Sequence, residues 1–261
     1  MKFNKEEGFC IMKEYIRKIE ELSFNAWPSH KTELYDGWIL RYSSNYTHRT
    51  NCVNLIASSK LPLAQKVIFC ENEYRAEKTP CIFKISPLTN PKVDKYLKEN
   101  GYQVEHVTEN MTLAFSDFIP FPNHIDVQLE NEITDEWITN LFNLNGTQDP
   151  VLRKIVPYMY HSIPKPTIAA SIYQDGKMVA SGLGILDRDH IGIYAIYVDA
   201  DYRRRHYAHA ICDALIHAGM KRGADHAYLQ VVKGNKPARW LYESLGFKYL
   251  YTYWFRTKYV I

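Results

Sequence analysis

The sequence of 261 residues predicts an α/β (α+β) fold built from two similar halves, each with a mixed sheet flanked by helices. Strand-like and helix-like patterns alternate along both halves. The segment Gly37–Tyr102 falls without a gap on Gly182–Phe247, so residue 37 matches residue 182 at an offset of 145. Between the halves, Phe115–Asp126 holds two prolines and is typical of a linker. We therefore expect one domain over residues 1–120 and a second over 126–261.

The second half has a clear order of elements. Thr134–Asn143 predicts a helix, because Thr134 is a good N-cap and apolar residues recur at helical spacing. Val151–His161 predicts another helix, kinked or ended by Pro157. The remaining expected elements are a strand at Val127–Leu129, a hairpin of Ile168–Tyr173 and Lys177–Leu186 around Asp175-Gly176, a strand at Ile191–Val198, a helix at His206–Lys221, a strand at Ala227–Val232, a helix at Pro237–Leu245 ended by Gly246, and a strand at Tyr249–Arg256.

Composition excludes several classes of protein. A net charge of +3 favours neither a nucleic-acid module nor strong electrostatic steering, so we expect no nucleic-acid partner. No apolar run approaches the roughly 18 residues of a membrane span. The first residues, Met1–Glu7, contain no apolar region of a secretory signal, so we expect a cytoplasmic protein without a membrane partner. The five cysteines form no C-x-x-C pair and predict buried, reduced thiols.

A basic turn follows the strand Ile191–Val198. Arg203, Arg204 and Arg205 lie directly before the helix His206–Lys221. A helix begins with free N–H groups and a dipole that favours an anion, so three arginines beside it predict a phosphate site. The alternative is a solvated basic corner.

The residues of this turn resemble the acyl-CoA signature of the GNAT acyltransferases, R/Q-x-x-G-x-G/A preceded by V-x-P-x-x, at Val198–Ala208. A second GNAT element, N-x-x-A-x-x-L/F-Y-x-x-L/x-G-F, is matched at Asn235, Ala238, Leu241, Tyr242, Leu245, Gly246 and Phe247. The first half is similar to the N-terminal half of bacterial tandem-GNAT proteins at Asn25–Pro28, Asp36–Arg41 and Thr47–Asn51. The resemblance implies mostly antiparallel sheets in both halves and a catalytic second half. Two positions depart from the signature: His206 replaces its first glycine and Ala200 its proline, which predicts looser acyl-CoA binding or an altered geometry.

The resemblance also implies an N-acetyltransferase in which an amine attacks the thioester of acetyl-CoA directly. Tyr242 would donate a proton to the departing thiolate, although it is also placed as a core tyrosine of an amphipathic helix. Asn235 would contact the pantetheine arm or only cap its helix. The residues expected to bind acetyl-CoA are Ile196, Tyr197, Val198, Arg203, Arg204, Arg205, His206, Tyr207, Ala208, His209, Asn235 and Tyr242.

The general base is less clear from the sequence. The strand Ile191–Val198 contains no carboxylate, so His190 and Tyr194 are the nearest candidates, with Asp189 beside the strand entry, and a water relay is a further possibility. In the first half the counterpart of Tyr242 is Leu97, and Pro62 removes an N–H group from the turn that matches the arginines. We therefore expect the first half to have lost the chemistry.

The sequence is compatible with several functions. The acceptor is a primary amine of a small molecule or a peptide N-terminus, and the rival is a non-catalytic acyl-CoA-binding or regulatory protein. A nucleic-acid binder that uses Arg203–Arg205 is the least favoured reading. The histidines His206, His209 and His217 lack further ligands apart from Asp213, so we expect no metal. A monomer and a homodimer are both compatible with the sequence.

Overall fold

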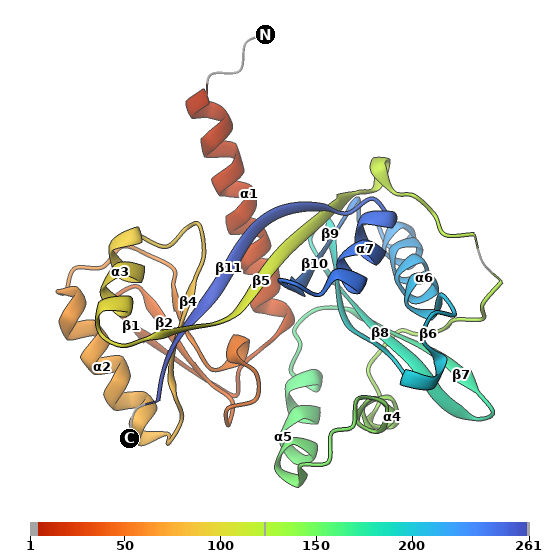
Figure 1. Cartoon of the computed structure of the whole chain (residues 1–261), viewed down its shortest axis with the longest axis horizontal. Coiled ribbons are helices and arrows are strands. Elements are labelled where there is room, and N and C mark those ends of the chain that lie inside the picture. The colour runs from red at the N-terminus through yellow and green to blue at the C-terminus, as the bar shows by residue number, and fades with distance from the viewer. Residues whose placement is uncertain (1–4, 123, 260–261) are drawn as a thin grey trace. The chain divides into compact units, whose positions relative to one another are not determined.

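The computed structural model describes residues 5–122 and 124–259 (Figure 1). Residues 1–4, on which the expectation of no secretory signal partly depends, lie outside the described residues, as do Asn123 of the expected linker and residues 260–261. The chain divides into two compact units. Unit 1 comprises the described residues of Met1–Glu21, Trp27–Thr108 and Tyr251–Ile261, and unit 2 comprises Leu22–Ala26 and Glu109–Leu250.

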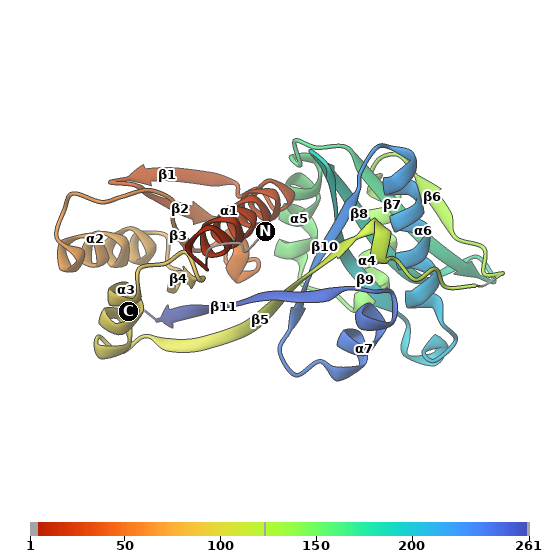
Figure 2. The same ribbon diagram turned by 90° about the horizontal axis from the view of Figure 1, so that it is seen from above.

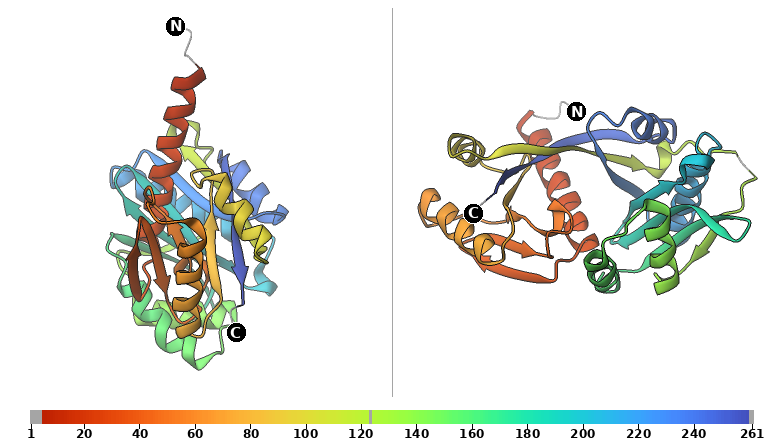
Figure 3. Two further views of the ribbon diagram at one scale, coloured as in Figure 1. Left: turned by 90° about the vertical axis from the view of Figure 1, so that its left-hand side faces the viewer. Right: turned by 60° about the horizontal axis from the view of Figure 1, so that its bottom comes forward.

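Unit 1 contains a mixed sheet in the order β1-β2-β3-β4-β11. Its strands are β1 (Lys31–Tyr35), β2 (Trp38–Tyr42), β3 (Val53–Leu55), β4 (Cys81–Ile85) and β11 (Lys248–Lys258), the last of which begins in unit 2. Only β3 and β4 are parallel, and the three other neighbouring pairs are antiparallel. The helices are α1 (Lys5–Ala26, in unit 1 up to Glu21), α2 (Leu63–Ala76) and α3 (Pro91–Glu99), with a short 3-10 turn η1 (His48–Thr50). In the left view of Figure 3, α2 and the hairpin β1–β2, in shades of orange, face the viewer.

The strands of unit 2 follow the order β5-β10-β9-β8-β7-β6 in the 11-stranded sheet of the chain. Its strands are β5 (Gln103–Ala114, in unit 2 from Glu109), β6 (Gln128–Glu130), β7 (Thr167–Gln174), β8 (Lys177–Asp187), β9 (His190–Val198) and β10 (His226–Val232). The pairs from β6 to β9 are antiparallel, and β9 and β10 are parallel. The helices are α4 (Asp135–Asn145), α5 (Pro150–His161), α6 (Tyr207–Lys221) and α7 (Lys236–Ser244), with 3-10 turns η2 (Phe115–Asp117) and η3 (Ala200–Tyr202).

The apolar core of unit 2 forms where α6 lies along β7, β8 and β9 (Figure 2). Close approach of the helix depends on Gly182 in β8, because a Cβ there would lie 2.3 Å from the Ile211 side chain. Ile191 and Ile193 of β9 belong to the same core. Since side chains alternate along a strand, Tyr194 lies on the opposite face of the sheet.

Most of the expected elements are confirmed. The Thr134 hydroxyl accepts a bond from the Trp137 N–H at 3.1 Å and begins α4, and Asp175-Gly176 turns the hairpin with φ of 50° and 77°. Four of the five cysteines are buried and all five are free. The expectation that Pro157 could end its helix is wrong, because α5 continues through Pro157 to His161. The proline removes only one helical hydrogen bond, and Val156, Met159 and Tyr160 on either side of it are buried.

The internal repeat is accurate for most of its length but wrong in the hairpin. Adding 145 to the bounds of α3 gives the bounds of α7, and the pairs α2/α6, β4/β10 and β5/β11 also coincide within a few residues. Gly37, however, lies in the β1–β2 turn, whereas Gly182 lies inside β8. The turn that matches Gly37 is at Gly176, because β8 continues several residues beyond the length of β2.

The two units exchange their equivalent strands β5 and β11. By the repeat, β5 should complete the sheet of the first half, but the place beside β4 is taken by β11, with Trp254 opposite Ile85 and Lys258 opposite Cys81. In unit 2 the place beside β10 is taken by β5. Residues 109–120 of the expected first domain therefore belong to unit 2, and residues 251–259 of the expected second domain belong to unit 1.

Candidate active site

The central strand β9 of unit 2 has a bulge at Ala195. Its φ is 49°, and the register with β8 shifts between the pairs Leu183–Tyr194 and Ser181–Tyr197. The Ser181 hydroxyl donates a hydrogen bond to the Ala195 carbonyl at 3.0 Å. A bulge interrupts the hydrogen-bond ladder and redirects the strand.

The pairing of β9 with β10 ends at Ile193, two residues before the bulge. Their paired residues run from His226–His190 to Leu229–Ile193, and within the described part of the chain no pairs follow, although both strands continue. Tyr197 is 46% exposed and Val232 is 51% exposed, which is unusual for strands inside a sheet. The part of β9 that is not paired with β10 includes residues 196–198, whose N–H groups the family resemblance assigns to the pantetheine arm.

The N-terminus of α6 lies directly after this open end of β9. Arg203, Arg204, Arg205 and His206 are all exposed there. His206 is the N-cap residue and its side chain makes no capping hydrogen bond. The first N–H groups of the helix, the helix dipole and three guanidinium groups thus face solvent together and suit a pyrophosphate.

His206 adopts the backbone conformation that a glycine of the signature would adopt. Its φ is 60° and its ψ is 15°, a left-handed conformation that costs a residue other than glycine about 1–2 kcal/mol. The His206 ring stacks on Phe121 at 5.1 Å between centroids, with His209 at 5.5 Å on another side. The Phe121 N–H is held in turn by the Asp213 carboxylate at 2.9 Å. The ring is therefore fixed against the linker.

Tyr242 lies on α7 and is 8% exposed. Burial, together with the nearby Cys212, raises the pKa of its hydroxyl far above the usual value, so the group keeps its proton at neutral pH. Its ring packs edge to face against Phe247 at 6.0 Å. Asn235 begins the same helix, and its Oδ1 accepts the Ala238 N–H at 3.3 Å. The capping role considered for Asn235 is thus present in the structure.

A row of polar side chains occupies the face of the sheet opposite α6. The Tyr194 hydroxyl donates to the Tyr228 hydroxyl at 2.9 Å, and Gln230 Nε2 donates to Ser23 Oγ at 3.0 Å. Burial and the bond with Tyr194 raise the pKa of Tyr228 well above its usual value. Tyr228, Gln230 and Ser23 are not among the site residues predicted from the sequence. The alternation of His226, Tyr228 and Gln230 with apolar residues along β10 could have indicated the first two.

His190 lies at the other end of β9. It is the first residue of the strand, and five residues at about 3.3 Å each put it roughly 17 Å from the bulge. Its ring is buried, stacks on His226 and has Nδ1 2.9 Å from the Asp189 carboxylate. Tyr194 is therefore adjacent to the bulge, whereas His190 lies at the opposite end of the strand.

The histidines of α6 do not converge on one point. His209 Nε2 is 3.0 Å from the Ser244 hydroxyl, and His217 Nδ1 is 3.2 Å from the Asp213 carboxylate. Because the His206 ring faces Phe121, these side chains form no common ligand set.

In unit 1 the corresponding anion site is filled by the chain itself. The Asp36 carboxylate accepts the N–H groups of Lys60 and Leu61 at 3.0–3.1 Å, just before α2. The buried Lys66 ammonium lies 3.3 Å from the same carboxylate. Pro62 begins the helix and Leu97 is fully buried. An internal carboxylate thus takes the place that a phosphate would need.

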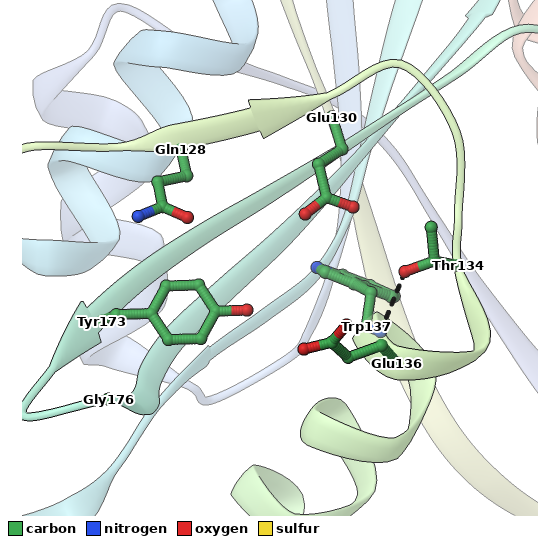
Figure 4. A pocket seen from close by; sticks show the side chains of 7 residues that line it. All are labelled: Gln128, Glu130, Thr134, Glu136, Trp137, Tyr173 and Gly176. Carbon is green, nitrogen blue, oxygen red and sulfur yellow. Dashed lines mark hydrogen bonds between the residues drawn. The ribbon is translucent and has the colours of Figure 1, made fainter.

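A separate pocket lies at the edge of unit 2 (Figure 4). It is lined by Gln128, Glu130, Thr134, Glu136, Trp137, Tyr173 and Gly176. None of the residues expected to bind acetyl-CoA is among them. The candidate site is therefore the open end of β9 and α6, and not this pocket.

Comparisons with known proteins bear on the family and the fold. The profile described as "Acetyltransferase (GNAT) family" matches residues 130–247. The uncharacterized N-acetyltransferase YobR of Bacillus subtilis (strain 168) is 24% identical over 246 residues, covering 93% of this chain and 98% of that protein. The ribosomal protein bS18-alanine N-acetyltransferase of Escherichia coli (strain K12) is 39% identical over 74 residues, 28% of this chain and 50% of that enzyme. A tandem GNAT protein from the clavulanic acid biosynthesis pathway has a similar fold, with a TM-score of 0.61, 9% identity, and coverage of 79% of this chain and 75% of that one.

Among the described residues, no helix is both long and apolar enough to cross a membrane.

Proposed function

The chain belongs to the GNAT family of N-acetyltransferases through residues 130–247. From this premise we propose the reaction that it catalyses. The chain transfers an acetyl group from acetyl-CoA to a primary amine by direct attack. The observation that carries this proposal is the separation of β9 and β10 beyond Ile193, beside the exposed N-terminus of α6.

The substrate acetyl-CoA is bound in two parts. Its pyrophosphate lies at the N–H groups and side chains of residues 203–208. Its pantetheine arm enters the gap along β9, where the N–H groups of Ile196, Tyr197 and Val198 hold it and polarise the thioester carbonyl. Asn235, at the start of α7, contacts the pantetheine arm in this proposal.

Tyr242 acts as the general acid. As the amine nitrogen forms a bond to the carbonyl carbon, the bond between carbon and sulfur breaks and the thiolate takes the Tyr242 proton. The hydroxyl is protonated when the thiolate leaves, but its raised pKa makes it a weaker acid, so the support for this role is the position of Tyr242 in the second GNAT element.

Tyr194 orients the amine, and water in the acceptor site takes the amine proton. The hydroxyl of Tyr194 donates to that of Tyr228, so its oxygen can accept a hydrogen bond from the amine. Tyr228 is 1% exposed and its pKa is raised, so both hydroxyls keep their protons and the pair supplies orientation. Because His190 lies at the far end of β9, we give it no part in this step.

The acceptor is a primary amine, either a small molecule or a peptide N-terminus. The 74-residue similarity to an enzyme named for an alanine of a ribosomal protein makes peptides beginning with alanine a sensible first panel. Small diamines and amino sugars form the second panel.

The test begins with a thermal-shift titration with acetyl-CoA, compared with desulfo-CoA. Ligand at one hundred times its dissociation constant should add about 2.7 kcal/mol of stability, a shift of several degrees. Thiol release is then followed with both amine panels. No shift at millimolar acetyl-CoA would refute the binding site, and a shift without acetyl transfer to any amine would refute the proposed reaction.

A further inference from the structure

Unit 1 holds a group of metal-ligating side chains that the proposed reaction does not use. His48 lies in η1, and Glu105 and His106 lie in β5. His48 Nε2 is 2.8 Å from Glu105 Oε2, and the His48 and His106 rings are 4.3 Å apart at their centroids. One potential ligand atom from each residue lies within 4.8 Å of the other two. We propose that these three side chains bind a divalent transition-metal ion.

The convergence depends on an irregularity in β5. Consecutive side chains of a regular strand point to opposite faces, so Glu105 and His106 should not both reach His48. His106 has a φ of 47°, however, and this left-handed residue breaks the alternation. The Thr108 hydroxyl donates to the His106 carbonyl at 2.8 Å and helps to hold this conformation. The irregular backbone thus turns a neighbouring carboxylate and imidazole toward the same partner.

The loop that carries His48 is also held firmly. The buried Asn51 side chain accepts the N–H groups of Ser43 and Asn45 and donates to the carbonyls of Tyr46 and Thr47, all at 2.6–3.1 Å. Thr47, directly before His48, has a φ of 54° and a ψ of 145°, a region that β-branched residues rarely adopt. A rigid support of this kind is what a metal site requires of its ligands.

The ligand chemistry points to a particular class of ion. The His48 imidazole is partly buried beside the Glu105 carboxylate, and a metal ion would replace the hydrogen bond between His48 Nε2 and Glu105 Oε2. Two imidazoles and one carboxylate suit Zn²⁺, Co²⁺, Ni²⁺ or Fe²⁺ better than Ca²⁺ or Mg²⁺. His106 is exposed, so its ring can turn toward an ion between His48 and Glu105, and water would complete the coordination.

A second group in unit 2 offers a natural comparison. Asp189, His190 and His226 also lie within 4.8 Å of one another by their ligand atoms. The rings of His190 and His226, however, are stacked with only 12° between their planes. Stacked rings do not direct their electron pairs at one ion, so we assign no metal to this group.

The test uses the full chain without a histidine tag, stripped with a chelator and dialysed. Co²⁺ is titrated and followed by its visible absorption, and Zn²⁺ is then added as a competitor. We expect one Co²⁺ per chain with a saturable band that Zn²⁺ removes. Glu105→Gln and His106→Asn should weaken binding at least tenfold. Asn is chosen because it tolerates the left-handed conformation. His226→Ala, in the comparison group, should leave binding unchanged.

Thermal shift with Zn²⁺ supplies the second readout. The wild-type chain should be stabilised by Zn²⁺, whereas His106→Asn should keep its melting temperature without Zn²⁺ and lose the gain. Since His106 is exposed, this variant decides the question even where His48→Ala does not fold. The proposal is overturned where Co²⁺ does not saturate below millimolar concentration, where His106→Asn binds as well as wild type, or where His226→Ala abolishes binding.

Discussion

Replacing Tyr242 by Phe should separate catalysis from folding. Among the described residues none donates to or accepts from the Tyr242 hydroxyl, and the ring is packed in the core of unit 2. Removing the oxygen therefore leaves no buried partner unsatisfied and avoids the penalty of about 1–3 kcal/mol that such a loss usually brings. We expect the free energy of unfolding to change by no more than about 0.5 kcal/mol.

The effect of this change on acetyl transfer should be much larger. A general acid typically contributes a factor of about 10²–10⁴, equivalent to roughly 3–5 kcal/mol in the activation barrier. The assay measures kcat by thiol release and the affinity for acetyl-CoA by calorimetry, with Tyr158→Phe on the exposed face of α5 as the matched control. We expect kcat to fall while the affinity stays within a factor of two or so. Unchanged kcat in Tyr242→Phe would refute the acid role, and a loss of stability above about 1 kcal/mol would refute the packing argument.

Three further predictions concern packing, binding and pH. Gly182→Ala should destabilise the chain by about 1–3 kcal/mol in urea, because its Cβ would lie 2.3 Å from Ile211; an unchanged midpoint would contradict the packing of α6. Arg203→Gln with Arg204→Gln should raise KM for acetyl-CoA about tenfold or more without lowering kcat, and KM for S-acetylpantetheine, which lacks the pyrophosphate, should not change. Burial and a neighbouring histidine lower the pKa of His209 below 6.5, so its contribution to stability is complete above pH 6.5 and is lost as the pH falls through the lower folded pKa. His209→Gln should remove that part of the pH dependence in urea titrations, and a profile identical to that of the wild-type chain would show that His209 does not titrate in this way.

The elements of unit 2 could be predicted because local signals mark their ends. Thr134 begins α4 and Gly246 follows α7, and both act within a few residues of their own position. The bulge at Ala195 could not be predicted, because alanine carries no preference for positive φ and the conformation is imposed by packing. The same holds for the gap between β9 and β10, which arises from pairing between segments that are distant in the sequence.

The candidate site was predictable to a similar extent. The turn Arg203–Ala208 and Tyr242 stand in recognisable motifs, and the structure shows the turn at the open end of β9. Tyr228 and Ser23 were missed because their relation to Tyr194 exists only in the folded chain. The exchange of β5 and β11 was missed for a different reason: under the internal repeat the two strands are equivalent, so no local pattern tells which sheet each one completes.

That exchange has a consequence for the order in which the chain can acquire its structure during synthesis. The sheet of unit 1 lacks its last strand until Trp254–Lys258 has left the ribosome, although β4, its partner, is made some 170 residues earlier. Until then, β4 is an unpaired edge of the sheet in the first half. Unpaired edge strands can associate with the wrong partner. A pairing so distant in sequence also favours slow folding. Shortening the chain at its carboxyl end would then damage the half that was synthesised first.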